Sequence, residues 1–347
     1  MSPMTLSVLL SSLALGTMIT LSSTHWLLAW MGLEINTLAI IPLMSQLHHP
    51  RAVEASTKYF LTQATASALV LFSSMNNAWV LGEWNITELE NPLSIITMTI
   101  ALSMKLGLAP LHFWLPEVLQ GLNLTTGLIL STWQKLAPLA LIYQIYPNLN
   151  VSLLMLFAIS STLMGGWGGL NQTQLRKIMA YSSIAHLGWM MIVLILMPKL
   201  MVLNLSIYLL LTSTMFLIMI TLTTTKISSL AISWSKTPTL TALASMTLLS
   251  LGGLPPFSGF LPKWLILQEL TKHNMGVIAS IMAFSTLLSL FFYLRLTYNL
   301  TLTISPNLTN APLTWNFHYN YKIVLPLTMM LSITLLPLSP AIISLLL

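Results

Sequence analysis

The chain has 347 residues, of which 56% are hydrophobic and only 6% are charged. A soluble protein of this size needs a polar shell around its core, so this composition excludes a soluble globule and indicates an integral membrane protein. The sequence contains no cysteine, which excludes disulfides, thiolate-held iron–sulfur clusters and cysteine zinc sites from this chain. Its net charge of +6 is scattered along the sequence, so no basic patch supports nucleic-acid binding.

Apolar runs of roughly 20 residues, the length that crosses about 30 Å of hydrocarbon, follow one another along the chain. We predict an all-α integral membrane protein with about eleven transmembrane helices in a single polytopic domain, residues 1–347. No basic residue precedes the first span, so we expect that span to be retained rather than cleaved as a signal peptide. The predicted spans are 3–22, 25–45, 57–80, 92–121, 124–145, 150–170, 175–197, 201–224, 238–267, 276–297 and 323–345. Residues 298–322 are polar, aromatic and proline-containing, which predicts a loop at the interface.

Two of these spans are predicted to be broken helices. The run KLGLAPLHFWLPEVLQ places Pro110 and Pro116 in an apolar segment, and proline lacks a backbone donor and clashes with the preceding turn. Freed carbonyls at membrane depth are tolerated only against protein or water, so this break indicates a functional discontinuity. The run LGGLPPFSGFLPKWLILQ repeats the same skeleton: Gly107 corresponds to Gly253, Leu108 to Leu254, Pro110 to Pro256, Leu115 to Leu261, Pro116 to Pro262 and Leu119 to Leu265.

The two broken spans are the fourth and the ninth in the predicted order, so equivalent elements run in opposite directions through the bilayer. We therefore predict two inverted five-helix repeats, about 1–145 and 150–297, each with a broken helix, followed by the loop and final span of 298–347. Paired broken helices in inverted halves are typical of a transport site near the bilayer midplane. The alternative is that both breaks are packing kinks.

Basic residues in short loops predict the orientation, because they remain on the inside of the membrane. Most of them fall on the side where the span count places the N-terminus: Arg51, Lys58, Arg176, Lys177, Lys226, Lys236, Arg295 and Lys322. We therefore expect the N-terminus on the inside and, with an odd number of spans, the C-terminus on the outside.

Four ionisable residues remain inside the spans once the loop charges are set aside: Glu34, Lys105, Lys135 and Lys263. A charge at the centre of a membrane helix costs roughly 2.5 to 3.5 kcal/mol on insertion scales, so these side chains must face the protein interior. Burial makes a lysine ammonium release its proton more readily, and a nearby carboxylate opposes that effect. Glu34 and Lys105 thus predict a two-state device that holds a proton when the pair is closed and releases it when the pair opens. A static ion pair that fixes helix packing is the alternative.

The other titratable residues of the spans leave more alternatives open. Lys135 has no acidic partner on its own predicted helix, which argues against a purely structural role. For Lys263 the alternative to a relay is that its side chain extends to the membrane surface. His112 lies between the two prolines of the first break, and His186 lies in the span AYSSIAHLGWM. Each imidazole is suited to relaying a proton or, equally, to bonding a freed carbonyl or hydroxyl.

Three segments carry a resemblance to a known family. The runs KLGLAPLHFWLPEVLQG, LNQTQLRKIMAYSSIAHLGWM and GGLPPFSGFLPKW resemble the antiporter-like subunits of respiratory complex I, the proton-pumping NADH:quinone oxidoreductase, and the resemblance covers essentially the whole chain. It implies that Glu34, Lys105, Lys135 and Lys263 form a proton relay at mid-membrane, driven by quinone reduction elsewhere in the complex. It also implies a mitochondrial inner-membrane location, with neighbouring antiporter-like subunits as partners.

The resemblance further implies that NADH, FMN, iron–sulfur clusters and ubiquinone are used by other subunits, so this chain is expected to hold no cofactor and to act on no small molecule except protons. Bacterial relatives have three further N-terminal spans, and contacts made by that bundle are not carried over. Two other functions remain open: a cation/proton antiporter, which would work without a redox partner, and a structural scaffold, in which the buried charges only fix assembly.

Overall fold

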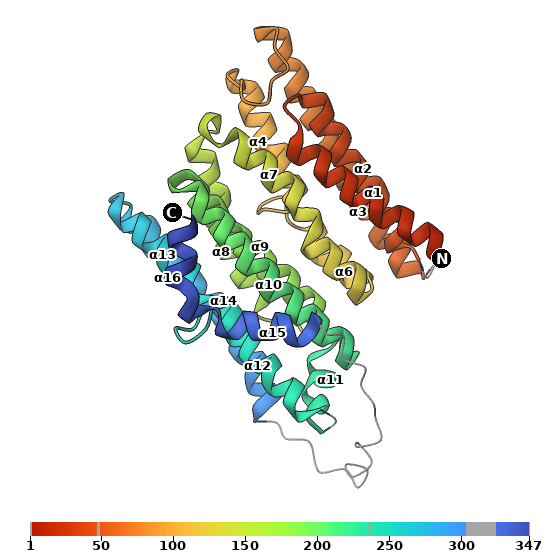
Figure 1. Cartoon of the computed structure of the whole chain (residues 1–347), viewed down its shortest axis with the longest axis vertical. Helices are drawn as coiled ribbons and strands as arrows, with labels where there is room; N and C mark the ends of the chain where they lie inside the picture. The colour runs from red at the N-terminus through yellow and green to blue at the C-terminus, as the bar shows by residue number, and fades with distance from the viewer. Residues whose placement is uncertain (1, 47–48, 236, 303–323, 347) are drawn as a thin grey trace. The chain divides into compact units, whose positions relative to one another are not determined.

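The computed structural model of the chain describes residues 2–46, 49–235, 237–302 and 324–346 (Figure 1). Within these ranges the protein is helical and contains no β-strand, which confirms the predicted all-α class. The chain divides into two compact units, Met1–Ser161 and Thr162–Leu347. The α-helices of the first unit are α1 (Pro3–Ser22), α2 (Trp26–Met44), α3 (Pro50–Leu81), α4 (Pro92–Leu106), α5 (Trp114–Gly121), α6 (Leu124–Ser131) and α7 (Leu136–Ile145), and α8 (Val151–Gly169) crosses the boundary.

The second unit has a similar alternation of long and short helices. Its α-helices are α9 (Leu175–Leu196), α10 (Pro198–Leu222), α11 (Ile227–Ile232), α12 (Pro238–Gly252), α13 (Phe260–Lys272), α14 (Gly276–Thr301), α15 (Val324–Thr334) and α16 (Ser339–Leu346). Helix α14 runs beyond residue 298, where the loop was expected to begin, because its apolar pattern continues through the last turn. The rest of that predicted loop, residues 303–323, lies outside the described residues, as do Lys236 and Lys322.

Prolines mark the beginnings of many helices. The first turn of a helix leaves its N–H groups without intrahelical acceptors, so a residue that lacks an N–H is favoured there. The residue before the proline often supplies the cap: the Asn91 side chain accepts a hydrogen bond from the N–H of Leu93 at 3.3 Å. The helices that begin at a proline start at Pro3, Pro50, Pro92, Pro198 and Pro238.

Both predicted helix breaks are present, and each follows a glycine. Helix α4 ends at Gly107 with φ of 79°, and α12 ends at Gly253 with φ of 80°, a left-handed conformation that only glycine adopts readily. Pro116 and Pro262 do not interrupt a helix, because each lies in the first turn of the helix that follows the break. The expectation that Pro116 breaks the helix was therefore wrong.

Two further spans that were predicted to be continuous are interrupted. Between α6 and α7 the chain forms a short 3₁₀ segment, η1 (Trp133–Lys135), and between α15 and α16 it forms another, η5 (Leu336–Leu338). Proline disrupts the helix at the carbonyl four residues earlier. For Pro138 that carbonyl belongs to Gln134, which lies within η1, so this proline explains the interruption beside Lys135.

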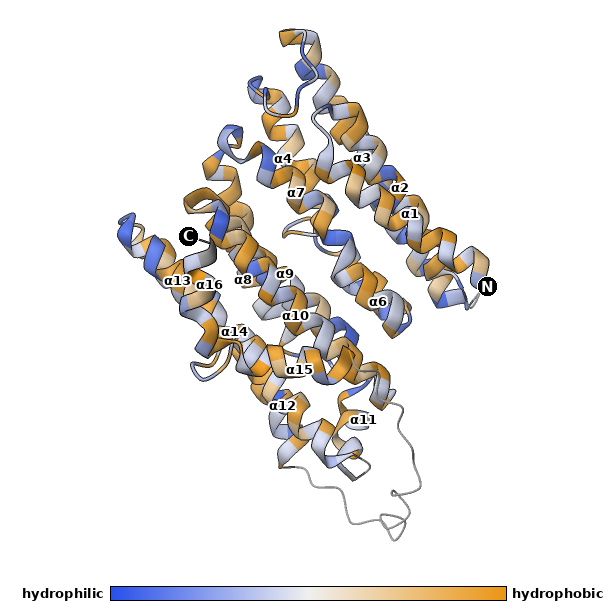
Figure 2. Ribbon diagram, in the orientation of Figure 1, coloured by the Kyte–Doolittle hydropathy of each residue, from blue (hydrophilic) through white to orange (hydrophobic). Residues whose placement is uncertain are grey.

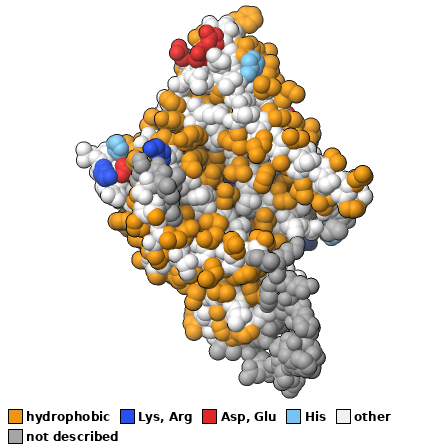
Figure 3. Space-filling model, viewed as in Figure 1, with side chains coloured by type: hydrophobic (Ala, Val, Ile, Leu, Met, Phe, Trp, Pro, Cys, Tyr) orange, Lys and Arg blue, Asp and Glu red, His pale blue; other side chains and the backbone are white. Residues whose placement is uncertain are grey.

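The composition of the helices and of the surface fits a membrane. Six of the described helices are long and apolar enough to cross a bilayer: α1, α2, α8, α9, α10 and α14. Apolar residues run along the helices in both units (Figure 2), and hydrophobic side chains predominate on the face shown in Figure 3. Large side chains such as Trp79, Trp167 and Phe284 are exposed on the isolated chain, as expected for a surface that lipid or neighbouring proteins cover.

In the first unit, helices α1 and α2 cross at a close contact between two glycines. A Cβ atom added at Gly16 would lie 2.9 Å from the Gly32 carbonyl oxygen, and one added at Gly32 would lie 2.9 Å from the Gly16 carbonyl oxygen. Small residues at such a crossing let two membrane helices approach each other closely. Helix α2 in turn packs against α3, and α3 packs against both halves of the first broken helix, α4 and α5.

Candidate functional site

Two of the predicted lysines meet at one small cavity in the first unit. Lys105 lies in the last turn of α4 and Lys135 lies in η1, with exposed fractions of 6% and 3%. Both line a cavity of about 20 Å³, room for on the order of one water molecule. The wall is completed by Leu33, Asn36, Thr37, Tyr59, Gln63, Leu106, Trp114, Leu115, Leu130, Gln134, Ala137 and Pro138.

The end of α4 determines the position of Lys105. The helix stops at Gly107, and the indole Nε1 of Trp114, on the far side of the break, donates to the Met104 carbonyl at 3.1 Å. The Trp114 ring also meets Tyr59 of α3 edge-on, with ring centroids 5.7 Å apart. The lysine ammonium therefore lies near the carbonyl end of a helix, where the helix dipole favours a positive charge. Its Nζ has no hydrogen-bond partner among the described residues.

Lys135 reaches the cavity because α6 and α7 are interrupted beside it. Figure 2 shows a hydrophilic stretch where these two apolar helices meet. The side chain of Gln134 donates to the Asn36 carbonyl at 3.2 Å and so joins η1 to α2. Pro138 has no N–H to donate to the Gln134 carbonyl, so the regular helical hydrogen bond is missing there. The contact of the Gln134 side chain with α2 therefore helps to hold the segment that carries Lys135.

Glu34 does not form an ion pair with Lys105 in this structure. Its Oε2 accepts a hydrogen bond from the Thr37 hydroxyl, one turn further along α2, at 3.1 Å. In the described part of the chain the ion pairs join Lys58 to Glu54 and Glu117, and Lys272 to Glu269. The Glu34 and Lys105 charges remain close enough to interact electrostatically. The Glu34–Lys105 pair that the sequence predicted is therefore not closed in this structure, and the two-state device stays a prediction.

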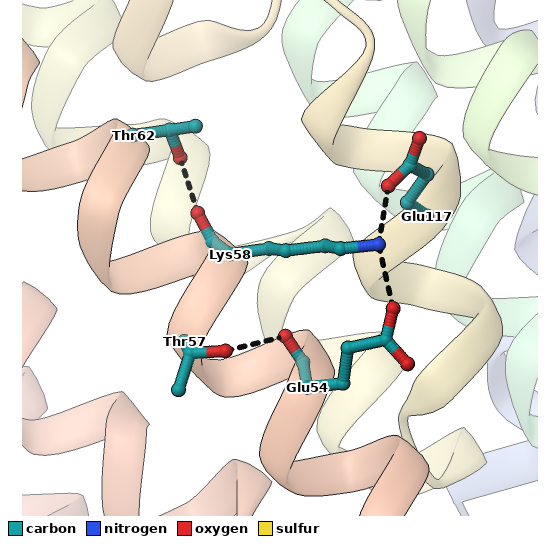
Figure 4. A network of polar contacts seen from close by, with 5 residues as sticks. All are labelled: Glu54, Thr57, Lys58, Thr62 and Glu117. Carbon is teal, nitrogen blue, oxygen red and sulfur yellow. Dashed lines mark hydrogen bonds and ion pairs between the residues drawn. The ribbon is translucent and has the colours of Figure 1, made fainter.

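Lys58 and Glu117 have a role that the sequence did not reveal. The Lys58 Nζ lies 2.7 Å from Oε1 of Glu54 and 2.8 Å from Oε2 of Glu117, so one ammonium joins α3 to α5 (Figure 4). All three side chains are exposed on the isolated chain. The ammonium holds the pKa of the Glu54 carboxyl below its usual range, because it stabilises the ionised form. This network holds α5, the second half of the broken helix, against α3, and the first two residues of α5, Trp114 and Leu115, line the cavity.

In the second unit Lys263 turns towards the helix break. It lies in the first turns of α13, and its Nζ donates to the Gly252 carbonyl at 2.8 Å, at the end of α12. The lysine thereby satisfies one of the carbonyls that the break leaves open and places its charge at the favourable end of the helix. This contact gives Lys263 a structural role in addition to any part in a relay.

The two candidate histidines are buried in different surroundings. His112 lies in the turn between α4 and α5 and is 2% exposed. It hydrogen-bonds with the Pro110 backbone, and its ring is tilted by 31° against that of Phe113, with centroids 4.4 Å apart. His186 lies in α9, with its ring centroid 5.6 Å from that of Tyr208. The contact of His112 with the Pro110 backbone is the carbonyl-bonding alternative that the sequence left open.

Reasoning from charges alone missed three amide side chains of the cavity. Asn36, Gln63 and Gln134 all lie within predicted apolar spans and line the cavity with the lysines. Amides buried in membrane helices need hydrogen-bond partners, so their presence at mid-span was a usable signal. No group of three or more His, Asp or Glu side chains that could hold a metal ion occurs within the described ranges.

Two family models, curated relatives and solved structures are similar to this chain over most of its length. The family model described as "NADH:quinone oxidoreductase/Mrp antiporter, TM" matches residues 23–289, and the model of the NADH dehydrogenase subunit 2 C-terminus matches residues 290–343. NADH-ubiquinone oxidoreductase chain 2 of Xenopus laevis is 67% identical over 98% of this chain and 99% of its own length. A chain of respiratory complex I from Thermus thermophilus is 26% identical, with a TM-score of 0.82 over 96% of this chain and 78% of that one. A chain of the Mrp complex from Dietzia has a TM-score of 0.76 at 18% identity, over 84% of this chain and 59% of that one, a likeness of fold alone.

Proposed function

Because the chain belongs to the NADH:quinone oxidoreductase and Mrp antiporter transmembrane family, we propose that it is a core membrane subunit of proton-pumping NADH:ubiquinone oxidoreductase. It contributes proton translocation rather than electron transfer. It is a multi-pass protein of the mitochondrial inner membrane, a location that follows from its animal relatives and its apolar helices.

The observation that carries this proposal is the burial of Lys105 and Lys135 against one cavity, each beside an interruption in an apolar helix. A buried ammonium is expensive in a membrane protein, so such residues mark ion and proton pathways. The cavity leaves room for on the order of one water molecule beside both lysines. A purely structural scaffold does not require buried charges to lie beside interrupted helices and a cavity.

The proposed relay consists of Glu34, Lys105, Lys135 and Lys263, with His112 and His186 as further candidates. When the Glu34 carboxylate approaches Lys105 it holds the lysine proton, and when it turns to Thr37, as it does here, that proton is free to move. The equivalent left-handed glycines, Gly107 and Gly253, support the view that the two broken helices belong to inverted repeats.

The proposal includes the number of spans, their orientation in the membrane and the partners of the chain. About eleven spans form two inverted repeats, near 1–145 and 150–297, followed by the final span, with the N-terminus in the matrix and the C-terminus in the intermembrane space. The partners are the bilayer and neighbouring membrane subunits, including other antiporter-like ones. NADH, FMN, iron–sulfur clusters and ubiquinone are bound by other subunits of the complex.

The test is the substitution Lys135→Met in the assembled complex, reconstituted into vesicles. Methionine keeps the apolar length of the side chain and removes the charge. Lys272→Met is the matched control, because Lys272 is exposed and forms an ion pair with Glu269 one turn away. We expect Lys135→Met to assemble but to lose most of its protons pumped per NADH oxidised, while Lys272→Met pumps normally. Normal pumping by Lys135→Met would refute the relay.

Two other functions give different results in the same vesicles. A scaffold predicts that Lys135→Met impairs assembly and leaves the pumping of any assembled complex normal. A cation/proton antiporter of Mrp type, which the description of the matching family model also names, predicts sodium- or potassium-driven proton exchange without NADH.

A further inference from the structure

Basic residues gather at one end of the second unit. An isolated antiparallel β-bridge between Gln174 and Lys226 joins the connection between α8 and α9 to the connection between α10 and α11. Near the end of α14, the Arg295 Nη1 donates to the carbonyl of Leu170, in the same connection between α8 and α9, at 2.8 Å. These contacts bring four cationic residues to this end of the unit: Arg176, Lys177, Lys226 and Arg295.

No acidic side chain of the second unit lies at that end. The structure describes all seven acidic residues of the chain, and only one of them, Glu269, belongs to this unit. Glu269 is ion-paired with Lys272 at the end of α13, just before α14 begins at Gly276. Arg295 lies 19 residues further along α14, roughly 28 Å at about 1.5 Å per residue. An anion that neutralises the four cations therefore comes from outside this unit.

A polar pocket lies beside Lys226, where α10 ends and α11 begins. It has a volume of about 380 Å³, and five hydroxyl side chains line it: Thr221, Thr223, Thr224, Ser229 and Ser233. The Lys226 N–H donates to the Ser229 hydroxyl at 3.3 Å, which places this lysine at the rim.

One hydroxyl of the pocket has no partner within the protein. The other four each donate to a backbone carbonyl nearby, whereas the Thr224 hydroxyl has no hydrogen-bond partner among the described residues, although Thr224 is only 3% exposed. Basic loops are usual on one side of a membrane protein, but that rule does not account for a polar pocket with an unpaired hydroxyl beside them. A buried polar group of this kind points to a bound water or ion.

An apolar groove begins close to this pocket. The Ser233 carbonyl accepts a hydrogen bond from the Thr237 N–H at 3.0 Å, and Thr239, two residues further on, lines the groove. Two residues span at most about 7 Å, so Thr239 lies within roughly 10 Å of Ser233. The groove has a volume of about 310 Å³ and lies between α12 and α15, which pack against each other (Figure 1). Along α15 it extends from Leu325 to Ile333, roughly 12 Å at about 1.5 Å per residue.

The pocket and the groove together have the chemistry of a phospholipid site. A phosphate binds to ammonium groups and hydroxyl donors, which the pocket supplies. The acyl chains of one leaflet reach about 15 Å, half of a hydrocarbon core of about 30 Å, and the groove has a similar length. A soluble phosphate would fill the pocket and leave the groove without an occupant.

We propose that this site binds an anionic phospholipid, with its phosphate against Lys226 and Thr224 and one acyl chain in the groove between α12 and α15. The lipid supplies the negative charge that the second unit lacks at this end. It also ties the end of α10 to the surface of the bilayer. The inference goes beyond the proposed function and does not depend on the proton relay.

The test uses the assembled complex in phosphatidylcholine vesicles that contain a trace of a phospholipid with a photoreactive acyl chain. One sample receives photoreactive phosphatidylglycerol, which is anionic, and the other receives photoreactive phosphatidylcholine with the same chains. After illumination, mass spectrometry measures the lipid attached to peptides of α12 and α15. We expect several-fold more labelling by the anionic lipid. Equal labelling by both lipids, or no labelling because an acidic protein covers the site, overturns the inference.

Two variants and two matched controls test the headgroup contacts. Lys226→Met should reduce anionic labelling to the phosphatidylcholine level, and Thr224→Val should reduce it in part, because valine keeps the shape without the hydroxyl. The controls are Lys272→Met, at the other end of the unit, and Thr221→Val, because the Thr221 hydroxyl already donates to the Ile218 carbonyl at 2.9 Å. Both controls should label like wild type. Unchanged labelling of Lys226→Met, or equal losses in Thr224→Val and Thr221→Val, overturns the inference.

Inorganic phosphate distinguishes a lipid headgroup from a soluble anion. Added in place of chloride at constant ionic strength, it should leave the labelling of α12 and α15 unchanged. Loss of labelling in phosphate would show that the pocket takes a soluble phosphate and would overturn the lipid assignment. None of these results affects the relay, which fails only if Lys135→Met pumps normally.

Discussion

The contact between Lys263 and the end of α12 leads to a quantitative prediction for Gly253→Ala. Gly253 has φ of 80°, and a side chain in this left-handed region costs about 1 to 2 kcal/mol. The added Cβ atom would lie 2.8 Å from both Cδ and Nζ of Lys263, so the lysine must leave the Gly252 carbonyl. Loss of a hydrogen bond from a charged group adds about 1.5 to 3 kcal/mol. The sum is about 2.5 to 5 kcal/mol of lost stability.

Gly82→Ala is the matched control for the backbone effect. Gly82 has φ of 77° at the end of α3, and a Cβ atom there would meet no atom within 4 Å. This variant should lose only the backbone contribution of about 1 to 2 kcal/mol. The difference between the two variants isolates the contact of Lys263 with the Gly252 carbonyl.

The assay is the midpoint temperature at which the detergent-solubilised complex releases this chain, followed on native gels. Gly253→Ala should have a lower midpoint than Gly82→Ala, and Gly82→Ala a lower midpoint than wild type. In the background of Lys263→Met, where the contact is already absent, Gly253→Ala should lose no more than Gly82→Ala does. Equal midpoints for Gly253→Ala and Gly82→Ala in the wild-type background would refute the reasoning.

Two further predictions concern the first broken helix. Trp114→Phe removes the hydrogen bond to the Met104 carbonyl and should lower the stability by about 1 kcal/mol. The loss should appear as a lower midpoint temperature in the same assay. An unchanged midpoint would mean that a water molecule replaces the indole N–H as the donor to that carbonyl. Lys58 holds the pKa of the Glu54 carboxyl below its usual range. The ion pair therefore stabilises the folded protein fully above the ordinary glutamate pKa of about 4.3, and this stabilisation is lost as the pH falls through the lowered pKa. In infrared difference spectra, with Glu54→Gln to assign the band, the carboxyl should protonate at lower pH in wild type than in Lys58→Met, and equal midpoints would contradict this effect.

The positions of the helix interruptions show how far sequence rules reach. Two of the interruptions are predictable from Gly107 and Gly253, because only glycine adopts the left-handed turn that ends α4 and α12. The interruption at Lys135 was also encoded, by Pro138, but it was missed because the span has the length of a single crossing and was therefore predicted to be continuous. Pro116 was predicted to interrupt a helix, but it lies in the first turn of α5. Proline disrupts a helix only when the helix already extends four residues before it.

The sequence by itself determined that this is a helical membrane protein and that Lys105 and Lys135 face its interior, because the cost of exposing a charge to lipid leaves no alternative. Only the tertiary structure decided which side chains surround those lysines. Asn36 and Gln63 come from α2 and α3, and their meeting with the lysines depends on how these helices pack, down to the close approach of α1 and α2. Helix packing fixes the rotation and depth of each helix, whereas the hydrophobicity of a span fixes only its presence in the membrane.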